Sequence, residues 1–168
     1  MIYRFRIVLD SMDDVFRDIE IKADDNLEDL HNAIVQAFEF EGNEMAAFYL
    51  SDDDWNQGEE IVLFDMSEGR NYVRIMNETS IDTVVSKSKT KLIYVYDFLD
   101  MWTFYVELAE ITTSEPGRNY PNLMYSQGIM PQNPPEKNFE SEEEEDEWDD
   151  DEGFGFDDFD DFDFDQWN

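Results

Sequence analysis

The chain contains no cysteine, and no stretch approaches the roughly 20 consecutive apolar residues that a membrane-spanning helix needs. Without cysteine, disulfides, thiolate metal sites and thiol catalysis are excluded. The N-terminal residues do not form the apolar region of a secretion signal, because Arg4 and Arg6 interrupt Met1–Leu9. We therefore expect a cytoplasmic protein with no membrane contact.

Positive charge is also scarce. Only 11 Lys and Arg residues oppose 44 Asp and Glu residues, which gives a net charge of −33, and none of the 11 lies beyond residue 138. The charge divides into about −16 for residues 1–138 and about −17 for residues 139–168. Such a surface repels the phosphate backbone, so direct binding of nucleic acid is not expected.

Residues 139–168 combine 17 acidic side chains with eight aromatic ones. This composition cannot bury enough apolar surface to fold alone, so we predict a disordered tail. The rings favour docking into hydrophobic pockets lined by Lys and Arg on a basic protein partner. A solubilising brush and the capture of cations remain as alternatives. The candidate partner-binding residues are Phe154, Phe156, Phe159, Phe162, Phe164 and Trp167.

The rest of the chain predicts one α+β core domain over residues 1–113, with a mainly antiparallel sheet. Alternating apolar residues in Met1–Leu9 and Val15–Ala23 indicate a hairpin with one buried face. On the other face this register brings basic and acidic residues together. We expect cross-strand ion pairs there rather than a ligand site, formed by Arg4, Arg6, Asp18 and Glu20.

The next predicted element is a helix packed across the sheet. Asp25 or Asn26 caps it, and Glu28 or Asp29 stands in the reciprocal capping position. An apolar stripe follows at helical spacing, and Gly42 supplies a stop signal. The stripe consists of Leu27, Leu30, Ile34, Ala37 and Phe38.

Further strands and one short helix are predicted before residue 112. The strands are Ala46–Leu50, Glu60–Phe64, Leu92–Phe98 and Trp102–Ile111, and the short helix holds Ile81 and Val85 behind a cap at Thr79 or Ser80. The order of hairpin, helix and strands is reminiscent of a β-grasp arrangement. Residues 114–138 contain all five prolines, so their composition predicts an irregular strap.

An acidic loop has part of the spacing of a calcium-binding loop. Asp52, Asp54 and Asn56 occupy alternate positions, as the first ligands of an EF-hand do. Gln57 and Leu63 stand where that loop needs its glycine and its bidentate glutamate. We interpret the segment as a solvated loop and predict no metal site.

Two runs of the sequence resemble the pRiA plasmid ORF-three-like domain family. One extends from Val15–Ile21 through Leu27–Ile34, and the other is the Tyr-Asp-Phe-x-Asp-x-Trp motif that ends at Trp102. The resemblance covers about residues 1–138, because Pro134 and Pro135 match a late family segment, and it leaves the tail outside. It implies that residues 114–138 are partly packed on the domain. Some members are named as passengers of insertion elements, which implies an accessory role in mobile-element biology.

The chain also departs from the family pattern. Where the family has histidines, this chain has Glu44–Phe48 and Phe104, and Leu99 replaces a glycine. The resemblance leaves a few matched positions, which imply structural roles or a hydrolase-like site. These are Arg17, Leu30, His31, Asp97, Asp100 and Trp102.

The sequence gives only weak support for any catalytic residue. His31, Asp97 and Asp100 are the titratable groups among the matched positions, and each also has a structural interpretation. The lone histidine suits a contact with the hairpin or a backbone carbonyl, and Asp97 suits a brace for the turn before Trp102. No phosphate-binding loop or nucleophile motif is present, so no cofactor is predicted.

The sequence therefore predicts a non-enzymatic interaction protein. Its acidic tail is expected to bind a basic protein partner, in particular one that handles nucleic acid and carries basic grooves with stacking surfaces. A mobile-element accessory protein and a hydrolase that uses His31, Asp97 and Asp100 are the alternatives.

Overall fold

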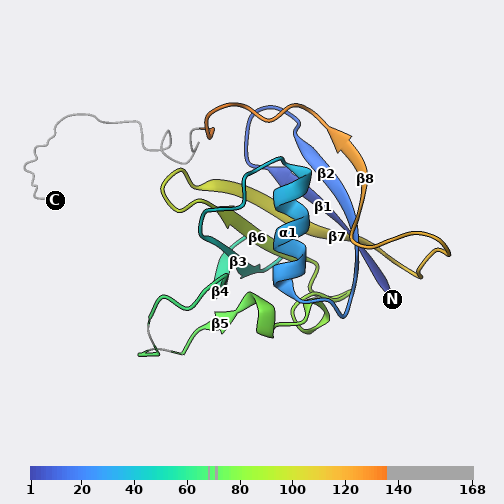
Figure 1. Cartoon of the computed structure of the whole chain (residues 1–168), viewed down its shortest axis with the longest axis horizontal. Helices are drawn as coiled ribbons and strands as arrows, with labels where there is room; N and C mark the ends of the chain where they lie inside the picture. Colours follow the sequence, from blue (N-terminus) through green and yellow to red (C-terminus); the bar gives the residue numbers. More distant parts are fainter. Residues whose placement is uncertain (68, 71, 136–168) are drawn as a thin grey trace, which may run out of the picture. The chain divides into compact units, whose positions relative to one another are not determined.

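The computed structural model describes residues 1–67, 69–70 and 72–135. Within them, Met1–Pro135 forms one compact α+β unit built on an eight-stranded sheet in the order β5-β4-β3-β6-β7-β1-β2-β8 (Figure 1). The strands are β1 (Ile2–Leu9), β2 (Phe16–Lys22), β3 (Ala46–Ser51), β4 (Gln57–Val62), β5 (Arg74–Ile75), β6 (Lys91–Tyr96), β7 (Trp102–Thr112) and β8 (Asn122–Gln127). Neighbouring strands are antiparallel except for the pair β4 and β5. Residues 139–168, for which the sequence predicts a disordered tail, lie outside the residues that the structure describes.

The N-terminal hairpin confirms the alternation in the sequence. In β1, the side chains of Tyr3, Phe5, Ile7 and Leu9 are buried, and those between them face outward. β2 pairs with β1 in a register that places Arg4 opposite Glu20 and Arg6 opposite Asp18. The period of two therefore decides which face of the sheet carries the core.

Helix α1 (Leu27–Ala37) covers one face of the sheet (Figure 1). Its cap is Asn26, whose side-chain oxygen accepts from the N–H of Asp29 at 2.9 Å. The carboxylate of Asp29 in turn accepts from the N–H of Asn26 at 3.1 Å, which completes the predicted capping box. The apolar stripe is buried throughout: Leu27, Leu30, Ile34, Ala37 and Phe38.

The helix ends earlier than the stop signal at Gly42 suggested. Phe38 is already its C-cap, and the chain turns away so that Phe38 enters the core and the partly buried Phe40 packs against it. Phe38 lies 4.6 Å from Phe104 between ring centroids, and Phe40 stacks on Tyr96 at 4.3 Å. Burial of these rings outweighs one more turn of helix.

The middle of the chain follows the prediction with small shifts. β3 and β4 form the expected hairpin around the acidic loop, and β6 and β7 form the later one. In place of a capped short helix there are two 3₁₀ turns, Met76–Glu78 and Ile81–Thr83. Ser80 precedes the second turn but makes no capping bond, because its hydroxyl donates to Asp82 instead. No helix in the described residues is long and apolar enough to cross a membrane.

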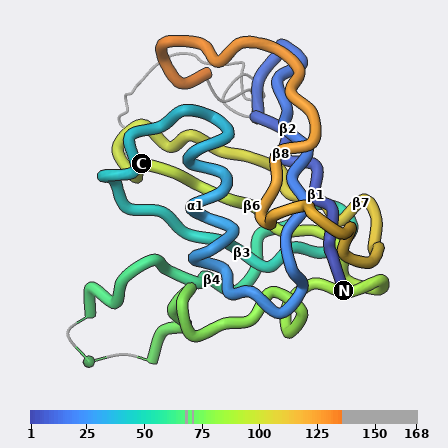
Figure 2. Tube along the Cα trace, turned by 45° about the vertical axis from the view of Figure 1, so that its right-hand side comes forward, coloured from blue at the N-terminus to red at the C-terminus, as the bar shows by residue number. Residues whose placement is uncertain are grey.

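Two expectations about topology need correction. A β-grasp sheet pairs its first strand in parallel with a later one, whereas β1 is antiparallel to both of its neighbours, β2 and β7. The composition of residues 114–138 predicted irregular chain, yet β8 lies there and pairs with β2 (Figure 2). All five prolines lie outside Asn122–Gln127, so none interrupts the ladder.

Candidate functional site

His31 lies on α1 with its side chain buried, at 3% exposure. Its Nδ1 is 2.7 Å from the hydroxyl of Tyr94, which is itself fully buried on β6. Burial lowers the pKa of His31 to about 4 and raises the pKa of Tyr94 well above its usual value. The imidazole is therefore neutral at pH 7 and already has a hydrogen-bonding partner.

A hollow of about 320 Å³ lies beside His31. It is lined by Glu28, Asn32, Glu44 and Phe64 among others, but neither Asp97 nor Asp100 contributes to its wall. None of the described residues that line it carries a hydroxyl or thiol nucleophile. The groups that a histidine-based hydrolase would need are not brought together here.

Asp97 shapes the turn between β6 and β7. Its backbone is left-handed, with φ of 67°, and its carboxylate accepts from the N–H groups of Leu99 at 3.1 Å and Asp100 at 3.4 Å. The Asp97 N–H also donates to the carbonyl of Met45 at 2.7 Å. These bonds confirm the interpretation of Asp97 as a brace for the turn.

Two other positions that match the family pattern, Leu30 and Trp102, make packing contacts within the domain. Leu30 is fully buried in the core, and Trp102 is buried against Phe40 at a centroid distance of 5.4 Å. These side chains hold α1, the chain after it and β7 together. Neither side chain is among the described residues that line the hollow beside His31.

Arg17 is the matched position with the richest contacts. Its Nε donates to the carbonyl of Ala37 at 3.1 Å, at the end of α1. One terminal nitrogen donates to the carbonyls of Phe16 and Gln127, both at 2.9 Å, and the guanidinium lies over the ring of Phe38. Burial lowers the pKa of Arg17. This arginine links β2, α1 and β8, a role that its position in the sequence did not reveal.

The expected ion pairs on the outer face are present. Arg6 binds Asp18 through two hydrogen bonds of 2.8 and 2.9 Å, and Arg4 lies 3.2 Å from Glu20. Glu20 is buried and also accepts from Arg118 at 2.9 Å, a contact that the hairpin pattern did not predict. Basic residues on this face are thus paired within the chain.

The acidic loop is organised by its own hydrogen bonds. Asp52 accepts from the side chain and the backbone of Asn56 and from the N–H of Asp54, and these bonds lower the pKa of the Asp52 carboxyl. Among the described residues, no cluster of three or more His, Asp or Glu side chains is arranged to hold a metal ion. The arrangement is that of a solvated Asx turn.

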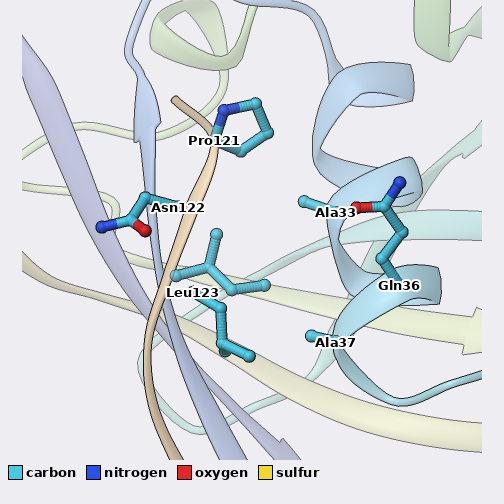
Figure 3. Close-up of a pocket in the computed structure, with 7 residues that line it drawn as sticks. Ala33, Gln36, Ala37, Pro121, Asn122 and Leu123 are labelled. Atoms are coloured by element: carbon cyan, nitrogen blue, oxygen red, sulfur yellow. The ribbon is translucent and has the colours of Figure 1, made fainter. Parts of the chain in front are cut away.

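The domain has two further hollows, one beside the acidic loop and one between α1 and β8. One of about 620 Å³ beside the acidic loop includes Arg74, Lys89 and Lys91, but Arg74 pairs with Glu59 and Lys91 with Glu107. The other, of about 230 Å³, lies between α1 and β8. Figure 3 shows Ala33 and Ala37 of the helix facing Leu123 of the strand across this second hollow.

These observations define a class of protein: a small α+β domain in which the described candidate residues serve structural contacts. The candidate rings from Phe154 to Trp167 lie outside the described residues. The chain matches the plasmid pRiA4b ORF-3-like protein family over residues 1–166 and belongs to that family. The family match continues beyond residue 138 to residue 166. The expectation that the tail lies outside the resemblance was therefore wrong.

The fold is shared with a solved structure. The protein of unknown function MM3350 from Methanosarcina mazei Go1 superposes with a TM-score of 0.65, over 74% of this chain and 68% of that chain. The two are 18% identical in sequence, so the likeness concerns the fold. The comparison with curated proteins found no match.

Proposed function

We propose that this chain is a non-enzymatic interaction protein that binds a basic protein partner through residues 139–168. The observation that carries the proposal is the state of the candidate catalytic groups. His31 is bonded to Tyr94 inside the core, and Asp97 braces a turn. The described lining of the hollow beside His31 includes neither Asp97 nor Asp100, so a hydrolase built on the three has no support.

The chemistry of residues 139–168 supports a basic partner. Their 17 carboxylates, unaccompanied by Lys or Arg, attract cationic surfaces, and their eight rings suit apolar pockets between those cations. Proteins that bind single-stranded nucleic acid present such surfaces, with basic grooves and aromatic platforms. The proposed partner is therefore a nucleic-acid-handling protein, and the proposed location is the cytoplasm.

The experiment compares three forms of the full chain as baits in host extract. In the first variant, Phe154, Phe156, Phe159, Phe162, Phe164 and Trp167 are all replaced by Ser, and in the matched variant all six are replaced by Leu. Both keep every carboxylate. We expect the native chain to capture a basic protein in low salt, the Ser variant to lose it, and the Leu variant to retain part of it.

Salt provides the second readout. Attraction between exposed charges is screened within about 8 Å at physiological ionic strength, so capture should weaken steeply as salt rises. If the native chain and the Ser variant recover the same proteins at both salt concentrations, the proposal fails.

A second candidate function follows from the family. The name of the family refers to a plasmid reading frame, and the chain matches the family over nearly its whole length. This supports an accessory role in mobile-element biology. Inspection of gene neighbourhoods tests it: copies that stand far from any plasmid or insertion element would count against the role.

A further inference from the structure

Strand β8 ends the sheet on one side. One of its edges pairs with β2, and no other described strand pairs with it. An edge strand exposes a row of backbone N–H and C=O groups, which is a template for another strand. Natural proteins guard such edges with charged side chains, prolines, very short strands, β-bulges or covering loops.

The two ends of this sheet differ in that protection. At the far end, β5 has two residues, and the neighbouring strand carries Glu59 and Glu60, with Arg74 paired to Glu59. β8 has six residues and no charged side chain. The uncharged stretch runs over residues 119–135, in a chain of which 33% is charged. The pairing of β8 with β2 shifts register between Asp18 and Ile19, where Met124 is the extra residue of a bulge in β8. This bulge is the one such guard within β8, since the strand contains neither a charged residue nor a proline.

Apolar side chains are exposed on and beside this strand. Leu123 is 48% exposed, Tyr125 is 51% exposed, and Ile129 is 90% exposed. Leu123 borders the 230 Å³ hollow on the helix side of the sheet (Figure 3), whereas Tyr125 contacts Phe16 at a centroid distance of 5.8 Å. An added strand would therefore meet apolar groups as well as a backbone ladder.

We infer that β8 pairs antiparallel with β8 of a second copy of this chain, about a twofold axis. Charge selects this occupant. Most of the surface carries an excess of carboxylates, so two copies repel wherever those surfaces meet. The uncharged stretch 119–135 lets them approach without placing like charges opposite each other. An isologous contact of this kind needs one self-complementary patch and closes as a dimer.

A basic partner is disfavoured at the same place. Beside β8, Arg6 pairs with Asp18 and Arg118 with Glu20, while Arg17 is buried with its guanidinium bonded to carbonyl oxygens, so none of the three is left free for a partner's carboxylates. A cationic protein gains more from the carboxylate-rich surfaces elsewhere on the chain than from an uncharged strand. The dimer is independent of the partner-binding function proposed above.

The first test measures the dissociation constant of the full chain by sedimentation as sodium chloride is raised from low to high concentration. Because both copies are strongly anionic, we expect dimerisation to strengthen with salt. Binding of a basic partner has the opposite salt dependence, so the two proposals fail separately. A chain that stays monomeric at every salt concentration, up to about 1 mM protein, overturns the inference.

Ser126 offers a substitution at the edge. Its side chain is exposed on β8. We expect S126E to weaken the dimer at least about threefold, since like charges on facing strands destabilise their pairing. S88E adds the same charge at an exposed turn away from β8 and should change it little. S126T should leave it unchanged, and equal effects of S126E and S88E would overturn the inference.

The absence of cysteine supplies a direct readout of strand pairing. Single cysteines placed in turn at each position of Asn122–Gln127 can form disulfides only between copies. In a self-paired antiparallel strand, cysteines near the twofold axis lie closest and crosslink fastest. S88C is the control. Crosslinking no faster than that of S88C at all six positions overturns the inference.

Discussion

The guanidinium of Arg17 donates a hydrogen bond of 3.1 Å to the carbonyl oxygen of Ala37, the last residue of α1. The last turn of this helix has no basic residue of its own. Arg17 of β2 therefore supplies the positive charge that the carbonyl groups at the C-terminal end of the helix attract. The same guanidinium holds the carbonyl of Gln127 on β8. One buried side chain thus joins three elements that are far apart in the sequence.

Replacing Arg17 with Met should lower the free energy of unfolding by about 2–4 kcal/mol, because three carbonyl oxygens lose their donor. Urea unfolding followed by circular dichroism measures this. Arg6→Met is the matched control: Arg6 is half exposed, so its loss should cost less than about 1 kcal/mol. Equal costs for the two variants would show that Arg17 does not link these elements.

The stability of the fold should fall as the pH drops from 7 to 5. The folded-state pKa of His31 is about 4, below the value of about 6.5 expected in the unfolded chain. The unfolded state then binds more protons in this window, so His31 contributes stability that is present above pH 6.5 and lost as the pH falls towards 4. The expected loss between pH 7 and pH 5 from this group is about 2 kcal/mol.

His31 is the single histidine of the chain, so its imidazole signal in proton NMR is unambiguous. The signal should show no titration between pH 8 and pH 5. A His31→Gln variant provides the control for the carboxylates, because it should lose the part of the pH dependence that belongs to the imidazole. A titration midpoint near 6.5 in the folded protein would contradict the buried, neutral state.

Substitutions at Asp97 separate a turn brace from a catalytic carboxylate. Asn also adopts left-handed backbone and its amide oxygen accepts the same bonds, so Asp97→Asn should change the stability by less than about 1 kcal/mol. Asp97→Ala loses the acceptor and strains the backbone at φ of 67°, with an expected cost of about 1–3 kcal/mol. Thermal unfolding measures both. An Asn variant as damaged as the Ala variant would mean that the negative charge itself is required.

Glu20 should matter more than its position on an outward face suggests. It is 1% exposed and lies between Arg4 and Arg118, so Glu20→Ala leaves two cations without their shared partner. We expect a loss of about 3–5 kcal/mol. Glu110→Ala removes an exposed partner of Arg4 and should cost less than about 1 kcal/mol. The ratio of the two costs, measured by urea unfolding, is the test.

Much of the N-terminal half was predictable because its signals are local. The alternation in β1 needs only neighbouring residues to show its buried face, and the capping box of Asn26 and Asp29 spans three positions. The ion pairs of Arg4 and Arg6 follow from the hairpin register. The end of α1 was less predictable, since it depends on the burial of Phe38 against β7.

The arrangement of residues at the candidate site depends on contacts between residues that are far apart in the sequence. The separation of His31 from the turn at Asp97, and the bond of His31 to Tyr94, arise from strand order, which no local spacing contains. β8 was missed because four of its six side chains are exposed and because a bulge at Met124 places Leu123 and Tyr125 on opposite faces of the sheet.

By itself, the sequence determined the alternating and helical faces, the capped start of α1 and the imbalance of charge, because these depend on neighbours along the chain. The tertiary structure alone decided that the proline-containing segment contributes an edge strand and that the matched polar residues serve as internal links. Each of those outcomes requires hydrogen-bonding groups far apart in the sequence to meet, as Arg17 and Gln127 do, and only the folded sheet brings them within reach.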